Sequence, residues 1–227
     1  MHFDWSFFAH LLFHPPGSFV AGAWRTIYLS VIAQALGVAL GLMLALWRRS
    51  RALPLRVFAS GYIWLVRGTP LLVQAVIIYD GSSALGLYSC GTVNIGVVSI
   101  PGVVQAGIVT LALNEGAYMA EIMRAAIDSV DKGQTEAAES LGMRRRQAMR
   151  HVVLPQAMRV VIPPLGNEFN NMLKVTSLLS VIGLQELFLA AQDYNSTTFR
   201  TFEIFLVTAI YYLSLIHISE PTRQAEI

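Results

Sequence analysis

The sequence predicts an all-α membrane protein with about five transmembrane helices and its N-terminus outside. Composition is the first indication. Hydrophobic residues make up 55% and charged residues 13% of the 227 residues, and the mean hydropathy is +0.55. A soluble domain carries nearer a quarter charged residues. The second indication is that the apolar residues gather in runs of roughly 20, the length that a helix needs to cross the hydrocarbon core of a bilayer.

Five apolar runs give the expected spans. In the first, four small residues recur at every fourth position, which predicts a smooth ridge along which another helix can approach closely. Gly68-Thr69-Pro70 interrupts the second run, and Pro163-Pro164 is expected to break the fourth near its start. The ridge residues are Ala33, Gly37, Gly41 and Ala45, and the spans are residues 23–47, 55–79, 103–127, 160–184 and 202–218.

The distribution of basic residues predicts the orientation. The link after the first span holds four arginines, and the link after the third holds Lys132 and five arginines, whereas residues 80–102 contain no Lys or Arg. The positive-inside rule therefore places both basic links in the cytoplasm and the N-terminus outside. The basic run 144–146 serves as a cytoplasmic retention signal, and no nucleic-acid partner is needed to explain it.

The two ends of the chain have unusual compositions. Residues 1–22 have no basic leader, so they are expected to form an outer interfacial segment, rich in Phe and Trp, rather than a cleavable signal peptide. Residues 214–227 resemble a translated sequencing adapter and are expected to be an artefactual tail. His10 and His14 have i,i+4 spacing, but two ligands alone predict packing and no metal site. Cys90 is interpreted as an incidental loop thiol.

The long second basic link contains the most specific motif. It reads Glu136-Ala137-Ala138, three residues, Gly142, nine residues, and then Val152-Val153-Leu154-Pro155. Residues 135–141 are predicted to form a short helix that Gly142 ends in a left-handed conformation. A second helix from about Arg144 is predicted to stop or kink before Pro155. A helix–turn–helix of this kind, with small residues at its tip, can seat in a cleft on a partner.

This pattern, E-A-A-x3-G-x9-I-x-L-P with Val152 in the isoleucine position, resembles the signature loop of permease subunits of binding-protein-dependent ABC importers. The resemblance extends from Phe3 to about Tyr212 and is to the polar amino-acid subfamily of histidine, glutamine and arginine type. Further matching segments are residues 67–74, 116–122, 163–169 and 176–183. Val175 and Glu115 depart from the subfamily pattern, which affects inference of the substrate.

The resemblance implies a type I ABC importer permease fold over residues 23–213, with a cytoplasmic coupling loop at 131–159. The implied partners are a second permease copy or paralogue, an ABC ATPase dimer, an external solute-binding protein and the lipid bilayer. The residues implied to couple to the ATPase are Glu136, Ala137, Ala138, Leu141, Gly142, Leu154 and Pro155.

Polar residues on two expected spans form the candidate substrate site. The residues on the third span share one helix face by their spacing, and those on the fourth belong to two overlapping stripes that meet at Lys174. If the two faces meet, their carboxylate, ammonium and amide groups could hold the charged ends of an amino acid near the middle of the membrane. Alternatively, Glu121 pairs with Arg124 and the asparagines join helices. The sets are Asn114, Tyr118 and Glu121 on the third span, and Asn171, Lys174 and Ser177 on the fourth.

No G-x4-G-K-[S/T] phosphate loop occurs in the sequence. We therefore expect no catalytic residue and no cofactor in this chain, with ATP bound by the partner ATPase. The expected function is the translocation subunit of an ATP-driven importer that works by alternating access. Two other functions are considered: a secondary transporter or channel without an ATPase, and, more remotely, an intramembrane enzyme that uses Glu121 or the histidines.

Overall fold

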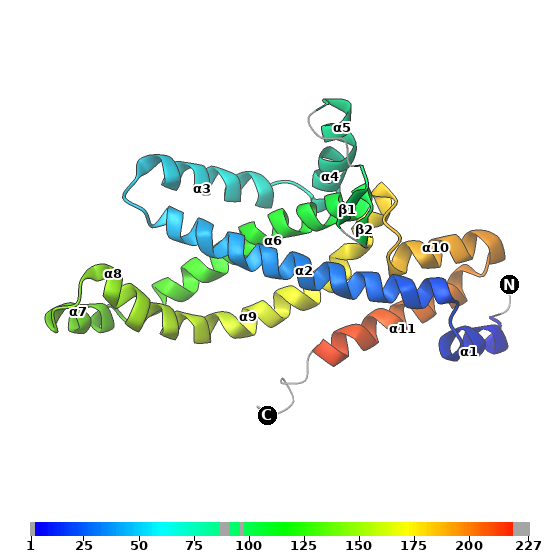
Figure 1. The fold of residues 1–227 in the computed structure, drawn as a ribbon. Helices are drawn as coiled ribbons and strands as arrows, with labels where there is room; N and C mark the ends of the chain where they lie inside the picture. The colour runs from blue at the N-terminus through cyan, green and yellow to red at the C-terminus, as the bar shows by residue number, and fades with distance from the viewer. Residues whose placement is uncertain (1–2, 87–90, 96–97, 220–227) are drawn as a thin grey trace. The chain divides into compact units, whose positions relative to one another are not determined.

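The computed structural model describes residues 3–86, 91–95 and 98–219, and within them the chain is a series of helices with one short hairpin (Figure 1). The α-helices are α1 (Trp5–Phe13), α2 (Gly17–Arg48), α3 (Leu53–Arg67), α4 (Leu71–Val76), α5 (Ser82–Ala84), α6 (Gly102–Asp128), α7 (Lys132–Ser140), α8 (Arg145–Ala148), α9 (Leu154–Val175), α10 (Leu187–Thr198) and α11 (Thr201–Ser219). The remaining elements are the π-helical turns η1 (Ile77–Gly81) and η2 (Met149–Val153), the 3-10 helix η3 (Thr176–Ile182), and the strands β1 (Val93–Ile95) and β2 (Val98–Ile100).

The chain divides into two compact units, each assembled from separate stretches of sequence. Unit 1 consists of Met1–Gln34, Pro70–Leu111 and Phe169–Ile227, and unit 2 consists of Ala35–Thr69 and Ala112–Glu168. The helices α2, α6 and α9 each contribute residues to both units.

Close packing of α2 on α6 organises unit 2. Gly37 lies directly against the side chain of Glu115, and Gly41 lies against Met119 and the backbone of Ala120. Because neither glycine has a side chain, the two helices approach closely here. Ala45 is fully buried in the apolar cluster beside them. The small-residue ridge predicted from the sequence is therefore confirmed in this unit.

Unit 1 contains the N-terminal helix and the last two helices. Leu11 of α1 and Phe19 of α2 are buried with apolar residues of α10 and α11. The carboxylate of Glu186 caps α10 by accepting hydrogen bonds from the backbone N–H groups of Phe188 and Leu189, at 2.8 Å each. It also accepts a 2.8 Å hydrogen bond from the Tyr212 hydroxyl of α11, which joins the two helices.

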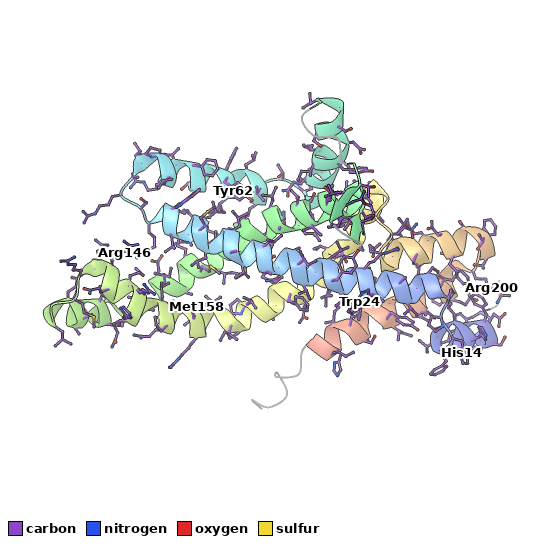
Figure 2. All side chains as sticks on the ribbon, viewed as in Figure 1. His14, Trp24, Tyr62, Arg146, Met158 and Arg200 are labelled. Carbon is purple, nitrogen blue, oxygen red and sulfur yellow. The ribbon has the colours of Figure 1, made fainter. Side chains whose placement is uncertain are left out.

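An ion pair attaches the start of the chain to the start of α11. Asp4 is the N-cap of α1, where its side chain accepts hydrogen bonds from Ser6 and Phe7, and it also pairs with Arg200. Figure 2 shows Arg200 beside α1, and its guanidinium lies 4.4 Å from the centre of the Phe7 ring. The aromatic N-terminal segment is thus a capped helix fixed to the last helix of unit 1.

Helices occupy all five spans predicted from the sequence. By length and apolar composition, α2 and α11 can each cross a membrane alone. Two broken pairs, Leu53–Arg67 with Leu71–Ala84 and Arg145–Ile182 with Leu187–Thr198, raise the possible number to four among the described residues. The 27-residue α6 has sufficient length, but it is not among these candidates because its polar residues lower its hydropathy.

The prediction that Pro163-Pro164 breaks the fourth span is wrong. The helix α9 runs through both prolines, and the change to 3-10 geometry comes only after Val175. Proline fixes φ near the helical value, so the main cost is lost hydrogen bonding and a local clash. Buried Ala157 and Val161, which pack in unit 2, hold the preceding turns in place.

Two elements lie in links between the predicted spans. The link 80–102 contains the antiparallel pair β1–β2, with Asn94 opposite Ser99. The link after the fourth span contains α10, which was not predicted. The last helix continues through Ser219. Cys90 and residues 220–227, part of the expected tail, lie outside the described residues.

Candidate functional site

The link 131–159, predicted to be a helix–turn–helix, starts with a well-defined helix in unit 2. Asp131 is the N-cap of α7, and its side chain accepts a 2.6 Å hydrogen bond from the backbone N–H of Gly133. A carboxylate at this position is favoured by the partial positive charge of the helix N-terminus. The first helix of the link therefore begins at a fixed point, Lys132, with three residues between it and the end of α6 at Asp128.

Gly142 ends this helix in the predicted left-handed conformation, with φ of +82°. Its N–H donates to the carbonyl oxygen of Glu139 at 3.0 Å, and the N–H of Met143 donates to that of Ala138 at 3.1 Å. These two bonds define a Schellman motif, which satisfies the last carbonyls of a helix and reverses the chain. The tip of the link is therefore a hydrogen-bonded turn with a defined geometry.

The tip presents an apolar side chain outward. Leu141 is 83% exposed and Met143 is 36% exposed, whereas Ala138 is only 5% exposed. Ala137 is also exposed. The apolar residues of α7 and its cap are therefore divided: Ala138 packs inside the hairpin, while Ala137 and Leu141 face outward. Together, Ala137, Leu141 and Met143 give the tip an exposed apolar surface, which a partner protein can cover.

The second half of the link confirms the distortion predicted before Pro155. The short helix α8 is followed by the π turn η2, which ends at Val153, and Pro155 is then the second residue of α9. Proline removes one helical N–H donor, and the π turn directly before Pro155 is the distortion with which the continuous helical segment accommodates this loss. Glu136 and Pro155 are exposed and Leu154 is half-buried, so most of the residues implied to couple to an ATPase are accessible.

A network of five charged residues lies where α2 and α6 end, directly before this link. Glu121 pairs with Arg48 and with Arg124, the latter at 3.0 Å from Nε. Asp128 pairs with Arg49 and with Arg124, here at 3.1 Å from Nη1. The pair Glu121–Arg124, proposed from spacing alone, is therefore present. Because Arg48 is the last residue of α2, Arg49 follows it directly and both acids are on α6, the network ties the ends of these two helices together.

The candidate substrate residues fall into both units, and each set shares one region of its own unit. In unit 2, Tyr118 is 37% exposed and Asn114 is half-buried. The Arg67 guanidinium stands 5.1 Å from the centre of the Tyr118 ring. Glu121 engages two guanidinium groups, and Arg48 comes from a different helix. Sequence reasoning missed the Arg48 and Arg67 contacts because no local pattern connects residues so far apart in the chain.

In unit 1, the other candidate residues surround the end of α9. Asn171 and Lys174 are exposed, and Ser177 is half-buried in η3. The Ser177 hydroxyl donates a 2.6 Å hydrogen bond to the carbonyl oxygen of Lys174. Substrate binding by either set remains a prediction. No group of three or more potential metal-ligating His, Cys, Asp or Glu side chains occurs within the part of the chain that the structure describes.

Comparisons with known proteins agree on one family. A family model described as "Binding-protein-dependent transport system inner membrane component" matches residues 37–220. The sequence is 37% identical over 205 residues to the "Probable glutamine ABC transporter permease protein GlnM" of Bacillus subtilis, covering 90% of this chain and 89% of that protein. It is 40% identical over 193 residues to the "Arginine transport system permease protein ArgU" of Corynebacterium glutamicum, covering 84% and 61% respectively.

Solved structures agree at the level of fold. One described as "Crystal structure of an amino acid ABC transporter with histidines" matches with a TM-score of 0.83 and 40% identity, covering 96% of this chain and 95% of that one. An inward-facing structure of the MetNI methionine ABC transporter shares the fold, with a TM-score of 0.72 and 18% identity over 89% and 91% of the two chains. This chain therefore belongs to the family of binding-protein-dependent transport system inner membrane components.

Proposed function

We propose that this chain is the permease subunit of an ABC importer for polar amino acids, and that the link 131–159 transmits the action of a separate ATPase. The permease class follows from the family, and the amino-acid substrates follow from relatives named for glutamine and arginine. The observation that supports the role of the link is the exposed Leu141 on the turn closed by Gly142. An apolar side chain at a fixed tip suits a cleft on a partner protein.

The proposed setting is the bacterial inner membrane, with the N-terminus outside and the two basic links inside. A complete importer then needs a second permease copy or a paralogue, two ATPase subunits and an external solute-binding protein. ATP is bound by the ATPase partners, and this chain contributes the path for the solute.

The proposed mechanism is alternating access. When ATP closes the ATPase pair, the contacts at Leu141 move the link. Nucleotide binding can shift the balance between inward-open and outward-open states only if such contacts differ between them. Within unit 2, the ion pairs of Glu121 and Asp128 attach α6 to the end of α2. A displacement of the link at the end of α6 is therefore transmitted to α2.

Co-purification with the ATPase tests this proposal. The permease would be co-expressed with the ABC ATPase encoded beside it, and Leu141→Asp would be compared with Leu53→Asp. Leu53 is a suitable control because it is 58% exposed in the same unit, at the first position of α3, where a negative charge is tolerated. We expect wild type and Leu53→Asp to retain the ATPase and solute-stimulated hydrolysis, and Leu141→Asp to lose both.

Two results would contradict the proposal. Full retention of the ATPase by Leu141→Asp would show that the tip is not the attachment point. Unchanged solute transport by the chain without any ATPase would favour a secondary transporter or a channel.

A further inference from the structure

Unit 2 contains a cavity lined by a guanidinium group that forms no ion pair among the described residues. Its volume is about 490 Å³, within the range of about 300–1,000 Å³ that is usual for small-molecule sites. It lies along α3 and α6 near the end of α2. The lining residues used below are Arg48, Ser60, Trp64, Arg67, Tyr118 and Glu121.

The acidic group of this cavity is already engaged. One carboxylate oxygen of Glu121 accepts from Arg48 and the other from Arg124. Arg67, by contrast, has no ion pair among the described residues, and its guanidinium lies over the Tyr118 ring. The lining therefore carries two guanidinium groups and one carboxylate. The excess positive charge belongs to Arg67, whose planar group offers five N–H donors.

The position of Arg67 along its helix makes this charge significant. It is the last residue of the 15-residue helix α3. At a rise of 1.5 Å per residue, it stands roughly 21 Å beyond Leu53 along the axis. If Leu53 lies at the inner membrane surface, as the proposed orientation requires, this distance places Arg67 within the hydrocarbon depth of about 30 Å. A charged group at that depth faces a cavity or a partner rather than lipid.

The contact with Tyr118 prepares the guanidinium for a ligand. A cation over a tyrosine face is held by the electrostatics of the ring, and this leaves the N–H donors at the edge of the guanidinium plane available. Those donors match the two oxygens of a carboxylate in a bidentate arrangement. Ser60 and the exposed Trp64 add a hydroxyl and an apolar surface to the same cavity.

We propose that Arg67 binds the α-carboxylate of the transported amino acid, with Tyr118 holding its guanidinium in position. The inference rests on the proposed function, because it assumes that this cavity opens to the solute path. A carboxylate ligand is favoured over an acidic side chain of another subunit because the cavity has the size of a small-molecule site and shares Tyr118 and Glu121 with the predicted substrate residues.

Ligand pairs that differ only in the carboxylate test the proposal directly. The permease–ATPase complex would be placed in phosphatidylcholine nanodiscs, where no anionic lipid can occupy Arg67. Binding would be measured in the absence of the solute-binding protein. L-Arginine is compared with agmatine, which lacks the α-carboxylate, and L-glutamine with glutaminamide, in which an amide replaces the α-carboxylate. Arg67→Gln is compared with Arg56→Gln, an exposed arginine on the same helix that does not line the cavity.

We expect Arg67→Gln to weaken binding of L-arginine and L-glutamine by about 10- to 150-fold, as when one hydrogen bond between charged groups is lost. Binding of agmatine and of the carboxamide should change less than about twofold, and Arg56→Gln should leave all four affinities unchanged. An equal loss for ligands with and without a carboxylate would assign Arg67 a structural or intersubunit role. No loss for any ligand would overturn the proposal as well.

Retention of the ATPase separates this inference from the proposed function. Arg67→Gln should still co-purify with the ATPase, whereas Leu141→Asp should not. Failure of the wild-type chain to co-purify with the ATPase would refute the proposed function. If the Arg67→Gln complex is intact and still prefers ligands with a carboxylate as the wild type does, only the role of Arg67 is refuted. If Arg67→Gln does not assemble with the ATPase, the same affinities are measured for Arg67→Lys. Weaker binding of only the ligands that carry a carboxylate supports the proposal, and equally weaker binding of both members of a ligand pair refutes it.

Discussion

Replacing Gly41 by alanine tests the close approach of α2 and α6. A Cβ atom at this position would lie 2.5 Å from the Cβ of Met119 and 2.9 Å from the backbone nitrogen of Ala120. Ordinary carbon contacts are about 3.5–4.0 Å, so the helices must separate by about 1 Å or distort. Because Ala120 contributes backbone atoms, rotation of a side chain cannot relieve the contact.

Two opposing effects determine how much Gly41→Ala changes the free energy of unfolding. Overpacking of this kind costs about 1–3 kcal/mol, while alanine in a helix interior is favoured over glycine by about 0.8–1.0 kcal/mol. Gly61 on α3 provides the matched control, since a Cβ added there meets no atom within 4 Å. Gly61→Ala should therefore keep the propensity gain alone. We expect the free energies of unfolding of the two variants to differ by about 1–3 kcal/mol, with Gly41→Ala the less stable.

Thermal unfolding of the purified chain in detergent, followed by tryptophan fluorescence, measures this difference. For a chain of this size, 1 kcal/mol corresponds to about 2–4 °C in Tm. Gly41→Ala should unfold several degrees below Gly61→Ala. If Gly41→Ala were as stable as Gly61→Ala, α2 and α6 would not approach as the structure shows, and the ridge argument would fail.

Two further predictions concern ion pairs. The side chains of Arg48 and Glu121 are 30% and 22% exposed, so a double-mutant cycle of Arg48→Gln and Glu121→Gln in the same unfolding assay should give a coupling energy of about 1 kcal/mol. A coupling energy of zero would contradict the pairing. At the other end of the chain, the hydrogen bonds from Ser6 and the Phe7 backbone, together with Arg200, hold the pKa of Asp4 below its usual value. The resulting stabilisation is complete above the unfolded-state pKa of about 3.9 and is lost as pH falls through the lowered pKa. The protection factors of the α1 amides, meaning exchange corrected for the pH dependence of intrinsic exchange, should therefore be high at neutral pH and fall in acid. In Asp4→Asn, which has no titratable group at this position, they should change less with pH; identical pH profiles for both proteins would count against the attachment.

Much of the local structure could be predicted from the sequence because it depends on nearby residues. The Schellman turn at Gly142 and the distortion before Pro155 follow from conformational preferences that act within a few positions. The ridge that includes Gly41 follows from helical periodicity, since small residues four apart lie on one face. The local rule for proline gave the wrong result at Pro163-Pro164, where tertiary packing of Ala157 and Val161 outweighs the tendency of proline to break a helix.

The sequence by itself determined that this is a helical membrane protein with a motif of importer permeases, because hydrophobic run lengths and short spacings are properties of the linear chain. Only the tertiary structure decided which charges are engaged. In the structure, Arg48 pairs with Glu121, which lies 73 positions away in the sequence. The Arg67 guanidinium lies over the Tyr118 ring, and Leu141 is exposed. No local pattern contains these results, because partner choice between distant residues depends on how the helices pack against one another.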